Sequence, residues 1–149
     1  MKKMLFIFLV IALSACTALS PAKSELERNR QKWQAAGIAH YRFSLRIGCF
    51  CGFMSQQPLT IEVRDGQVIS MLDNSGQPVT AQYKQFYDLY ATMDLLFAKA
   101  EESLSGGADE VKIEYDPTYG FPTLIALDPI KQAVDDELSL QITNFEALK

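Results

Sequence analysis

Apolar and polar residues alternate strictly in two stretches of this chain, and this alternation constrains the fold more than any other feature. Apolar side chains occupy every second position over 41–47 and again over 59–63. Because residues two apart on a strand share a face, each stretch predicts a strand with one buried and one solvated face. Asp65 and Gly66 then supply the positive φ angles of a tight hairpin, which leads into a return strand over 67–72.

Two other segments have the apolar spacing of amphipathic helices. Ser24 and Glu27 match a capping box that starts the first helix, and Gly37 offers a C-terminal cap. Trp33, the only tryptophan in the chain, lies on the apolar face of this helix and is predicted to anchor the core. The second helix is predicted over about 89–104, with an apolar stripe of Leu89, Met93, Leu96, Phe97, Ala100 and Leu104.

Three further strand signals follow, over 111–115, 121–127 and 138–142. The order is therefore one helix and three strands, twice over, which is compatible with an internal repeat. Strands that are polar on one side favour an antiparallel sheet with both helices on the other face. We predict a single α+β domain over 24–149, a two-layer sandwich in which two helices cover one face of a sheet of about six strands.

The first 15 residues have the pattern of a lipoprotein signal peptide. Two lysines precede an apolar run over 5–13, which is too short to span a bilayer, since a spanning helix needs about 20 residues. The run ends in Leu13-Ser14-Ala15-Cys16, which resembles a bacterial lipobox. By that resemblance the chain is cut before Cys16, and residues 16–23 form a lipidated cysteine and a tether. An ordinary secretory signal with a chance cysteine is the alternative.

Charge and motif content narrow the classes of function. The chain has 14 Lys+Arg and 18 Asp+Glu, a formal net charge of −4, which argues against nucleic acid because phosphate binding needs a basic surface. It has no G-x-S-x-G elbow, no H-E-x-x-H pair and no P-loop. A Ser-His-Asp triad would have to use His40, the single histidine. We therefore predict a binding domain rather than an enzyme, with no cofactor and no metal.

The segment Gly48-Cys49-Phe50-Cys51-Gly52 is the most informative candidate site. With Cys16 lipidated, Cys49 and Cys51 are the two free sulfurs, in a compartment that favours disulfides. Residues two apart on a regular strand lie about 6.5–7 Å apart, whereas a disulfide prefers about 5.5–6 Å between Cα atoms. The flanking glycines would let the chain buckle and close this gap. A local disulfide is favoured over a redox-active dithiol, a metal site or free thiols.

Acidic residues gather near the C-terminus at Asp128, Asp135, Asp136 and Glu137. Calcium takes six to eight oxygen ligands from a loop with regular spacing, and this run lacks that spacing. The acidic run is therefore predicted to be a solvated loop.

Tyr119 and Phe121 form a second candidate surface. Both belong to the predicted hairpin over 115–123, where Pro117 and Gly120 favour a turn. Tyr119 sits at that turn, where a large aromatic side chain has little core to enter. Because tyrosine is enriched at binding hot spots, Tyr119 with Phe121 as its neighbour is a candidate partner surface. The alternative is that Tyr119 folds back over the hairpin.

Several motifs occur in a fixed order between Trp33 and Phe145. They are Tyr41-x-Phe43, Cys49-Phe50-Cys51, Val63-Arg64-Asp65-Gly66, Met93-Asp94-x-Leu96-Phe97, Gly107-Ala108-Asp109, Tyr115-Asp116-Pro117-x-Tyr119-Gly120-Phe121-Pro122-Thr123 and Ala133-Val134-Asp135-Asp136-Glu137. This ordered set resembles an uncharacterised family of small bacterial lipoproteins and secreted proteins that share a domain of unknown function. The resemblance implies a single domain and an envelope location, and it implies no activity.

These observations together predict a lipid-anchored lipoprotein of the bacterial cell envelope. Thr17 follows the predicted lipidated cysteine, which favours the outer membrane, facing the periplasm, by the sorting rule of enteric-type bacteria. The membrane contact is made through the N-terminal lipid, and the domain is expected to bind an envelope protein or a small ligand. The alternative function is a thiol-redox or metal-handling lipoprotein that uses Cys49 and Cys51.

Overall fold

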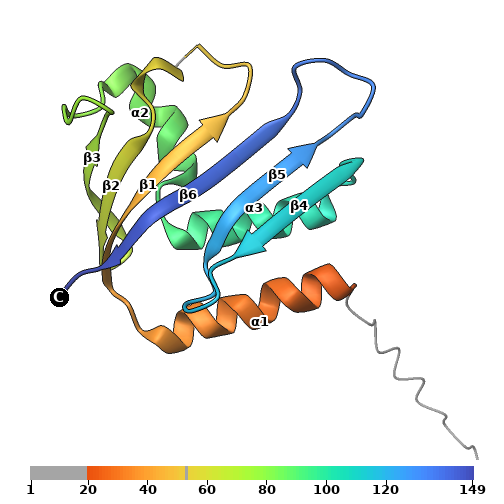
Figure 1. Cartoon of the computed structure of the whole chain (residues 1–149), viewed down its shortest axis with the longest axis horizontal. Helices are drawn as coiled ribbons and strands as arrows, with labels where there is room; N and C mark the ends of the chain where they lie inside the picture. The colour runs from red at the N-terminus through yellow and green to blue at the C-terminus, as the bar shows by residue number, and fades with distance from the viewer. Residues whose placement is uncertain (1–19, 53) are drawn as a thin grey trace, which may run out of the picture.

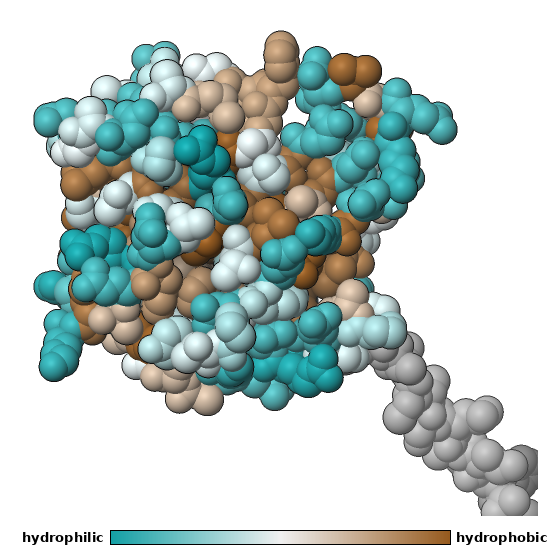
Figure 2. All heavy atoms as spheres, in the orientation of Figure 1, coloured by the Kyte–Doolittle hydropathy of each residue, from teal (hydrophilic) through white to brown (hydrophobic). Residues whose placement is uncertain are grey.

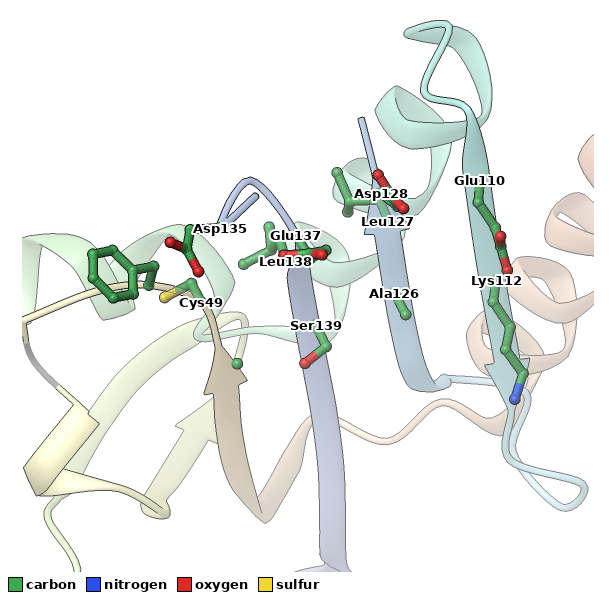
Figure 3. A pocket seen from close by; sticks show the side chains of 12 residues that line it. Cys49, Glu110, Lys112, Ala126, Leu127, Asp128, Asp135, Glu137, Leu138 and Ser139 are labelled. Carbon is green, nitrogen blue, oxygen red and sulfur yellow. The ribbon is translucent and has the colours of Figure 1, made fainter. Parts of the chain in front are cut away.

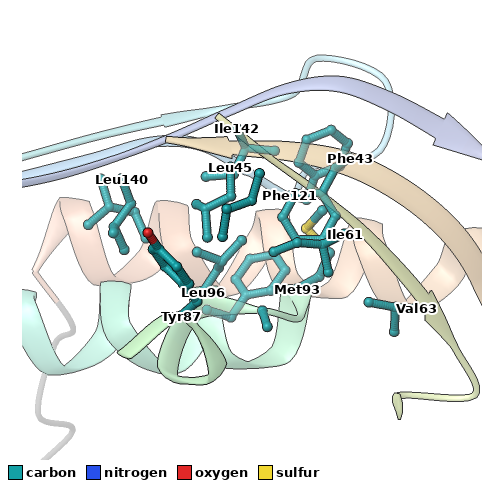
Figure 4. Close-up of a cluster of buried hydrophobic side chains, with 14 of the residues drawn as sticks. Phe43, Leu45, Ile61, Val63, Tyr87, Met93, Leu96, Phe121, Leu140 and Ile142 are labelled. Carbon is teal, nitrogen blue, oxygen red and sulfur yellow. The ribbon is translucent and has the colours of Figure 1, made fainter. Parts of the chain in front are cut away.

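A computed structural model describes residues 20–52 and 54–149. Within these residues the chain folds as an α+β sandwich, with an antiparallel six-stranded sheet and helices packed against one face (Figures 1 and 4). This is the fold class that the strand alternation predicts. The predicted signal peptide and Cys16 lie outside the described residues.

The described part of the chain contains three α-helices, two short 3-10 helices and six strands. They are α1 (Pro21–Ala36), β1 (His40–Gly48), η1 (Met54–Gln56), β2 (Leu59–Arg64), β3 (Gln67–Leu72), α2 (Ala81–Tyr87), η2 (Asp88–Tyr90), α3 (Met93–Ser105), β4 (Glu110–Tyr115), β5 (Pro122–Asp128) and β6 (Leu138–Ala147). The sheet order is β3-β2-β1-β6-β5-β4, and every neighbouring pair is antiparallel. The first and last strands therefore lie side by side at the centre of the sheet, as Figure 1 shows.

The sheet order lacks the symmetry that an internal repeat of the two halves would give. In a repeat, β1 of the first half would correspond to β4 of the second half. A twofold axis normal to the sheet could relate two such halves, because it keeps all helices on one face. It would place corresponding strands equally far from the centre of the sheet. Here β1 is central and β4 is an edge strand, so the two halves are not related in this way.

The local signals for the first hairpin and for the end of the first helix are confirmed. Asp65 and Gly66 join β2 to β3 with φ angles of 50° and 75°. Gly37 ends α1 in the left-handed conformation, with φ 60°, and its N–H donates to the carbonyl of Gln34. These positions depend on neighbours in the sequence alone, which is why the sequence predicts them.

The start of α1 differs from the predicted capping box. Ser20 is the N-cap, and its hydroxyl accepts a hydrogen bond from the Lys23 N–H at 3.3 Å. Pro21 occupies the first helical position, where its missing N–H has no intrahelical partner to lose. Residues 21–23, predicted as tether, are therefore helical, and Ser24 does not start the helix.

The second long helix begins later than predicted, and a short helix precedes it. Thr92 is the N-cap of α3, and its hydroxyl accepts from the Leu95 N–H at 3.3 Å. Residues 81–90 form α2 and η2, so Leu89 lies before α3 and is 59% exposed rather than part of the apolar stripe. The remainder of the predicted stripe packs inward, with Met93, Leu96, Phe97 and Ala100 buried and Leu104 half-buried.

The core lies between the sheet and the helices (Figure 4). Trp33 is buried, and its ring meets the rings of Tyr41, Phe121 and Phe145 edge-on, at centroid distances of 5.4, 5.9 and 5.9 Å. The Tyr41 hydroxyl accepts a hydrogen bond from the Met93 N–H at 3.0 Å, and burial raises the pKa of Tyr41 to about 12. Aromatic packing therefore joins α1 to the sheet, and one buried hydrogen bond joins β1 to α3.

Candidate functional site

The sheet face that is turned away from the helices is hollowed at one end. The hollow has a volume of about 570 Å³ and lies where β1 and β5 end and where β4 and β6 begin (Figure 3). The loops that follow β1 and precede β6 both rise at this end of the sheet (Figure 1). In Figure 2 the same end is indented beside the hydrophilic lobe at the upper right. We call this hollow the groove.

Small residues on neighbouring strands form the floor of the groove. Gly48 on β1 pairs with Ser139 on β6, and Ser139 pairs with Ala126 on β5. A side chain at position 48 would collide with the Ser139 hydroxyl oxygen, so Gly48 is what allows this hydroxyl to lie over β1. The row two residues towards the centre of the sheet carries Arg46 and Gln141, whose longer side chains leave no such hollow.

Carboxylates surround the floor. Asp128 ends β5, and Asp135 and Glu137 belong to the segment just before β6. In Figure 3 Asp135 lies beside Cys49, and Glu137 and Asp128 lie between Cys49 and β4. Glu110, which pairs with Asp128 across β4 and β5, adds a fourth acidic side chain at the β4 end. The groove is therefore rimmed by acidic residues, and its floor is uncharged except for Lys112, which pairs with Ala126 in the same row.

The negative charge of the groove is only partly balanced. Lys112 lines the groove but pairs with Glu114 at 2.7 Å, and Lys131 pairs with Glu110 at 3.1 Å. Among residues 20–52 and 54–149, no basic side chain lies within ion-pair distance of Asp128, Asp135 or Glu137.

The excess of negative charge in the groove affects the pKa of Asp128. Partial burial and the negative charges of its neighbours, chiefly Asp136 and Glu137, raise the pKa of this carboxyl above its ordinary value. Within the described part of the chain, Asp128 Oδ1 is shielded from water and has no hydrogen-bond partner. The ionised carboxylate is therefore poorly satisfied, and an approaching cation would stabilise it.

The predicted local disulfide is confirmed. Cys49 and Cys51 are joined, with their Cα atoms 5.3 Å apart. The chain makes a tight turn here, in which the Cys51 N–H donates to the Cys49 carbonyl at 2.9 Å, and this turn shortens the separation found on a regular strand. Cys49 lines the groove, and Phe50 between the cysteines lines it too and is 83% exposed. As a disulfide, the pair offers no thiolate to a metal.

The predicted partner surface at Tyr119 and Phe121 needs correction. Phe121 is 2% exposed and stacks on Phe145 with a centroid distance of 4.5 Å, so its ring belongs to the core. Tyr119 is half-buried and rests against Phe145 at 5.5 Å, which agrees with the alternative that it folds back over the hairpin. A partner contact by the remaining exposed part of Tyr119 stays a prediction.

The turn over 116–120, which leads from Tyr115 to Phe121, has a structural role. Asp116 Oδ1 accepts from the N–H groups of Thr118 and Tyr119, at 2.9 and 2.6 Å, and so closes the turn. Gly120 lies against α1 with a φ of 83°, where an added Cβ would come within 2.5 Å of the Asn29 carbonyl oxygen. Lys32 of α1 donates to the carbonyl of Pro117. The turn is thus fastened onto α1.

His40 lies at the opposite end of β1 from the cysteines, as predicted. Its Nε2 atom is 2.8 Å from Glu62 Oε1, and its Nδ1 atom is 3.2 Å from the Lys149 carbonyl oxygen. It therefore joins strand ends and does not reach the groove. In the described part of the chain, no three His, Cys, Asp or Glu side chains converge to hold a metal ion.

Sequence reasoning missed the groove because its parts come from distant segments. Asp135 and Glu137 lie exposed in the loop before β6, as the acidic run predicts, whereas Asp128 ends β5, and all three line the groove. Only strand pairing brings Gly48 beside Ser139 and Glu110 beside Asp128. The single local signal was Gly48, a glycine at the end of an otherwise regular strand.

Comparison with known proteins identifies one relationship. The model of a family of unknown function (DUF6174) matches residues 25–147, which include every strand of the sheet. No curated protein and no solved structure matches the chain. In the part of the chain that the structure describes, no helix is long and apolar enough to cross a membrane.

Proposed function

Since the chain belongs to this family of unknown function (DUF6174), which brings no activity with it, we propose a function from the surface of the molecule. The protein is a lipid-anchored protein of the bacterial cell envelope, and its groove binds a basic segment of another envelope protein. The anchor rests on the lipobox at Leu13-Ser14-Ala15-Cys16, and the binding role rests on the groove.

One observation carries the choice of ligand: within the described residues, three carboxylates of the groove have no basic side chain at ion-pair distance, and the nearby Lys131 is paired with Glu110. A lysine or arginine side chain that entered the groove would meet Asp128, Asp135 and Glu137 and would offset the repulsion between Asp128 and Glu137. The hollow, at about 570 Å³, has the size of an ordinary ligand site, which is about 300–1,000 Å³. A negative groove also steers cationic segments towards itself during diffusion.

Binding is favoured over catalysis by the chemistry that the groove holds. It offers carboxylates and the Ser139 hydroxyl, whereas His40 lies at the far end of β1. A serine nucleophile needs a base within hydrogen-bond reach, and no histidine of the described chain stands near Ser139.

The position at which α1 begins limits how far the domain, and so its partner, can lie from the membrane. Because α1 begins at Pro21, four residues, 17–20, separate Cys16 from the helix. Even fully extended, four residues reach only about 14 Å. A lipid on Cys16 would therefore hold the domain close to its membrane, so we propose that the partner segment lies near the same membrane.

The test measures binding of short peptides to the mature chain carrying Cys16→Ser, which avoids the lipid. Fluorescence anisotropy would compare three labelled peptides of equal length, built from lysine and serine, from glutamate and serine, and from serine alone. We expect the lysine peptide alone to bind, more tightly at low ionic strength. The double variant Asp135→Asn/Glu137→Gln should weaken this binding about tenfold or more.

A matched control variant removes the same two negative charges from a surface far from the groove. Asp88→Asn/Glu102→Gln neutralises one aspartate and one glutamate on the helical side, where both are exposed and paired with lysines. This variant should bind like the parent chain. Equal loss of binding in both double variants, or equal binding of the lysine and glutamate peptides, would overturn the proposal.

A further inference from the structure

Phe50 is exposed where an apolar ring would ordinarily be buried. Its side chain is 83% exposed, whereas most other large apolar side chains of the described chain are wholly or partly buried. A ring left in water is unfavourable compared with a buried ring, and ligand sites are commonly lined by apolar and aromatic side chains. Phe50 is also part of the groove lining, so its exposure is at the candidate site itself.

The disulfide explains why Phe50 cannot turn inward. Cys49 packs against the core, and the bond to Cys51 together with the hydrogen bond from Cys51 N–H to Cys49 C=O closes a tight ring around residue 50. With its two neighbours tied to each other, the residue between them is directed away from the ring that they form. A bridge between residues two apart closes too small a loop to constrain the unfolded chain greatly, so its main consequence is this local geometry.

The aromatic ring and the carboxylates share one groove. Phe50 stands on the loop after β1, and Asp135 stands on the loop before β6. Val134, the neighbour of Asp135, is also 83% exposed. A phenylalanine side chain has only two rotatable bonds and loses little conformational entropy on binding, which suits it to be an anchor.

We propose that the Cys49–Cys51 disulfide presents Phe50 as an apolar contact beside the acidic groove, so that the partner segment carries an apolar residue next to its basic residue. This inference rests on the proposed function, because the basic residue is the one that the carboxylates bind. It names the chemistry of the partner more closely: a basic residue with an apolar neighbour rather than an isolated positive charge.

The experiment compares two peptides of equal length and charge that differ at the residue beside lysine, which is leucine in one and serine in the other. The parent chain with Cys16→Ser should bind the leucine peptide about five- to tenfold more tightly. Phe50→Ala should abolish this preference and keep the dependence on lysine. Phe50→Leu, which remains apolar but loses the ring, should keep most of the preference, and loss of the preference in this variant would overturn the apolar reading.

Two further variants test the disulfide and the specificity of the effect. Cys49→Ser/Cys51→Ser keeps Phe50 but releases it, so the preference should fall towards that of Phe50→Ala. Leu89→Ala removes an exposed apolar side chain from η2, away from the groove, and should change nothing. Circular dichroism melts would verify that each variant is folded, and Phe50→Ala leaves the disulfide in place if the double cysteine variant does not fold.

The outcomes separate this inference from the proposed function. An unchanged leucine preference in Phe50→Ala overturns the inference, and the proposed function stands if Asp135→Asn/Glu137→Gln still weakens lysine-peptide binding. Full preference in a folded double cysteine variant overturns the role of the disulfide. If lysine peptides do not bind at all, the proposed function fails, and the same leucine and serine peptides without lysine then decide whether Phe50 makes an apolar contact.

Discussion

At the scale of single residues, Gly48 and Gly120 each lie so close to another atom that a side chain would collide with it. At Gly48 the neighbouring atom is the hydroxyl of Ser139, the far end of a side chain that can rotate. At Gly120 it is the backbone carbonyl of Asn29 in α1, which cannot move without displacing the helix. The same substitution should therefore have different consequences at the two positions.

Gly120→Ala should destabilise the fold by about 2–4 kcal/mol, because it adds a collision with α1 to the strain of a non-glycine residue at φ 83°. Urea denaturation of the parent and variant chains measures the loss. A loss below about 0.5 kcal/mol, within the range of ordinary surface substitutions, would mean that the turn does not press on α1.

Gly48→Ala should cost under about 1 kcal/mol, because Ser139 can rotate away, but it should fill the floor of the groove. The lysine-peptide binding described above should then weaken while the urea midpoint hardly changes. Unaltered binding in this variant would place the peptide elsewhere on the molecule.

Asp128 predicts a dependence of stability on pH. Its raised pKa means that the folded chain holds the proton at a higher pH than the unfolded chain does, so ionisation of this carboxyl opposes folding. The penalty is absent below the ordinary carboxyl pKa of about 4, grows as the pH rises to the raised value and is complete above it.

Asp128→Asn should therefore raise the melting temperature at neutral pH, and this gain should vanish as the pH falls below about 4. Melts across this pH range measure it. Glu102→Gln, which removes an exposed carboxylate from α3, provides the comparison and should show no such gain. A gain for Asp128→Asn that persists in acid would contradict the electrostatic cause.

At the scale of elements, α1 is fastened to the rest of the molecule by three kinds of contact. Trp33 inserts among aromatic rings of the sheet. Arg30 lies over the Phe97 ring at 5.7 Å and pairs with Glu101 of α3 at 2.7 Å. Gly120 and its turn cover the helix from the other side. The aromatic contacts should dominate, because an exposed ion pair contributes at most about 1 kcal/mol.

Trp33→Ala and Phe97→Ala should each cost about 3–5 kcal/mol, since both remove large side chains from the core on the helix side of the sheet. Denaturant melts give these values directly. Arg30→Ala should cost much less, which separates packing from charge. Losses below about 1 kcal/mol for both aromatics would mean that the helices do not cover the sheet.

At the scale of the whole molecule, anchoring and binding are separable. Cys16→Ser should abolish incorporation of a fatty-acid analogue and leave the signal peptide uncut by the lipoprotein peptidase. Metabolic labelling of the parent and variant chains in cells measures this, and equal labelling of both would rule out the anchor. The folded domain should be unaffected, because α1 begins only at Pro21.

Features that depend on near neighbours in the chain can be predicted from the sequence. The alternation over 41–47 and 59–63, the turn at Asp65-Gly66 and the cap at Gly37 all follow from the conformational preferences of consecutive residues. The local disulfide belongs here as well, because its partners are two residues apart. The α+β class followed from the order of these elements.

The groove and the burial of Phe121 depend on long-range strand pairing, which the sequence does not reveal. The pairing of β1 with β6 brings Gly48 beside Ser139 and so forms the groove. A bulge near Asn144, with φ 52°, interrupts the alternation of β6 and turns Phe145 towards Trp33, so that Phe121 is buried rather than exposed. Periodicity tells which side of a strand is apolar, but it carries no information about which strand lies alongside or where the register slips.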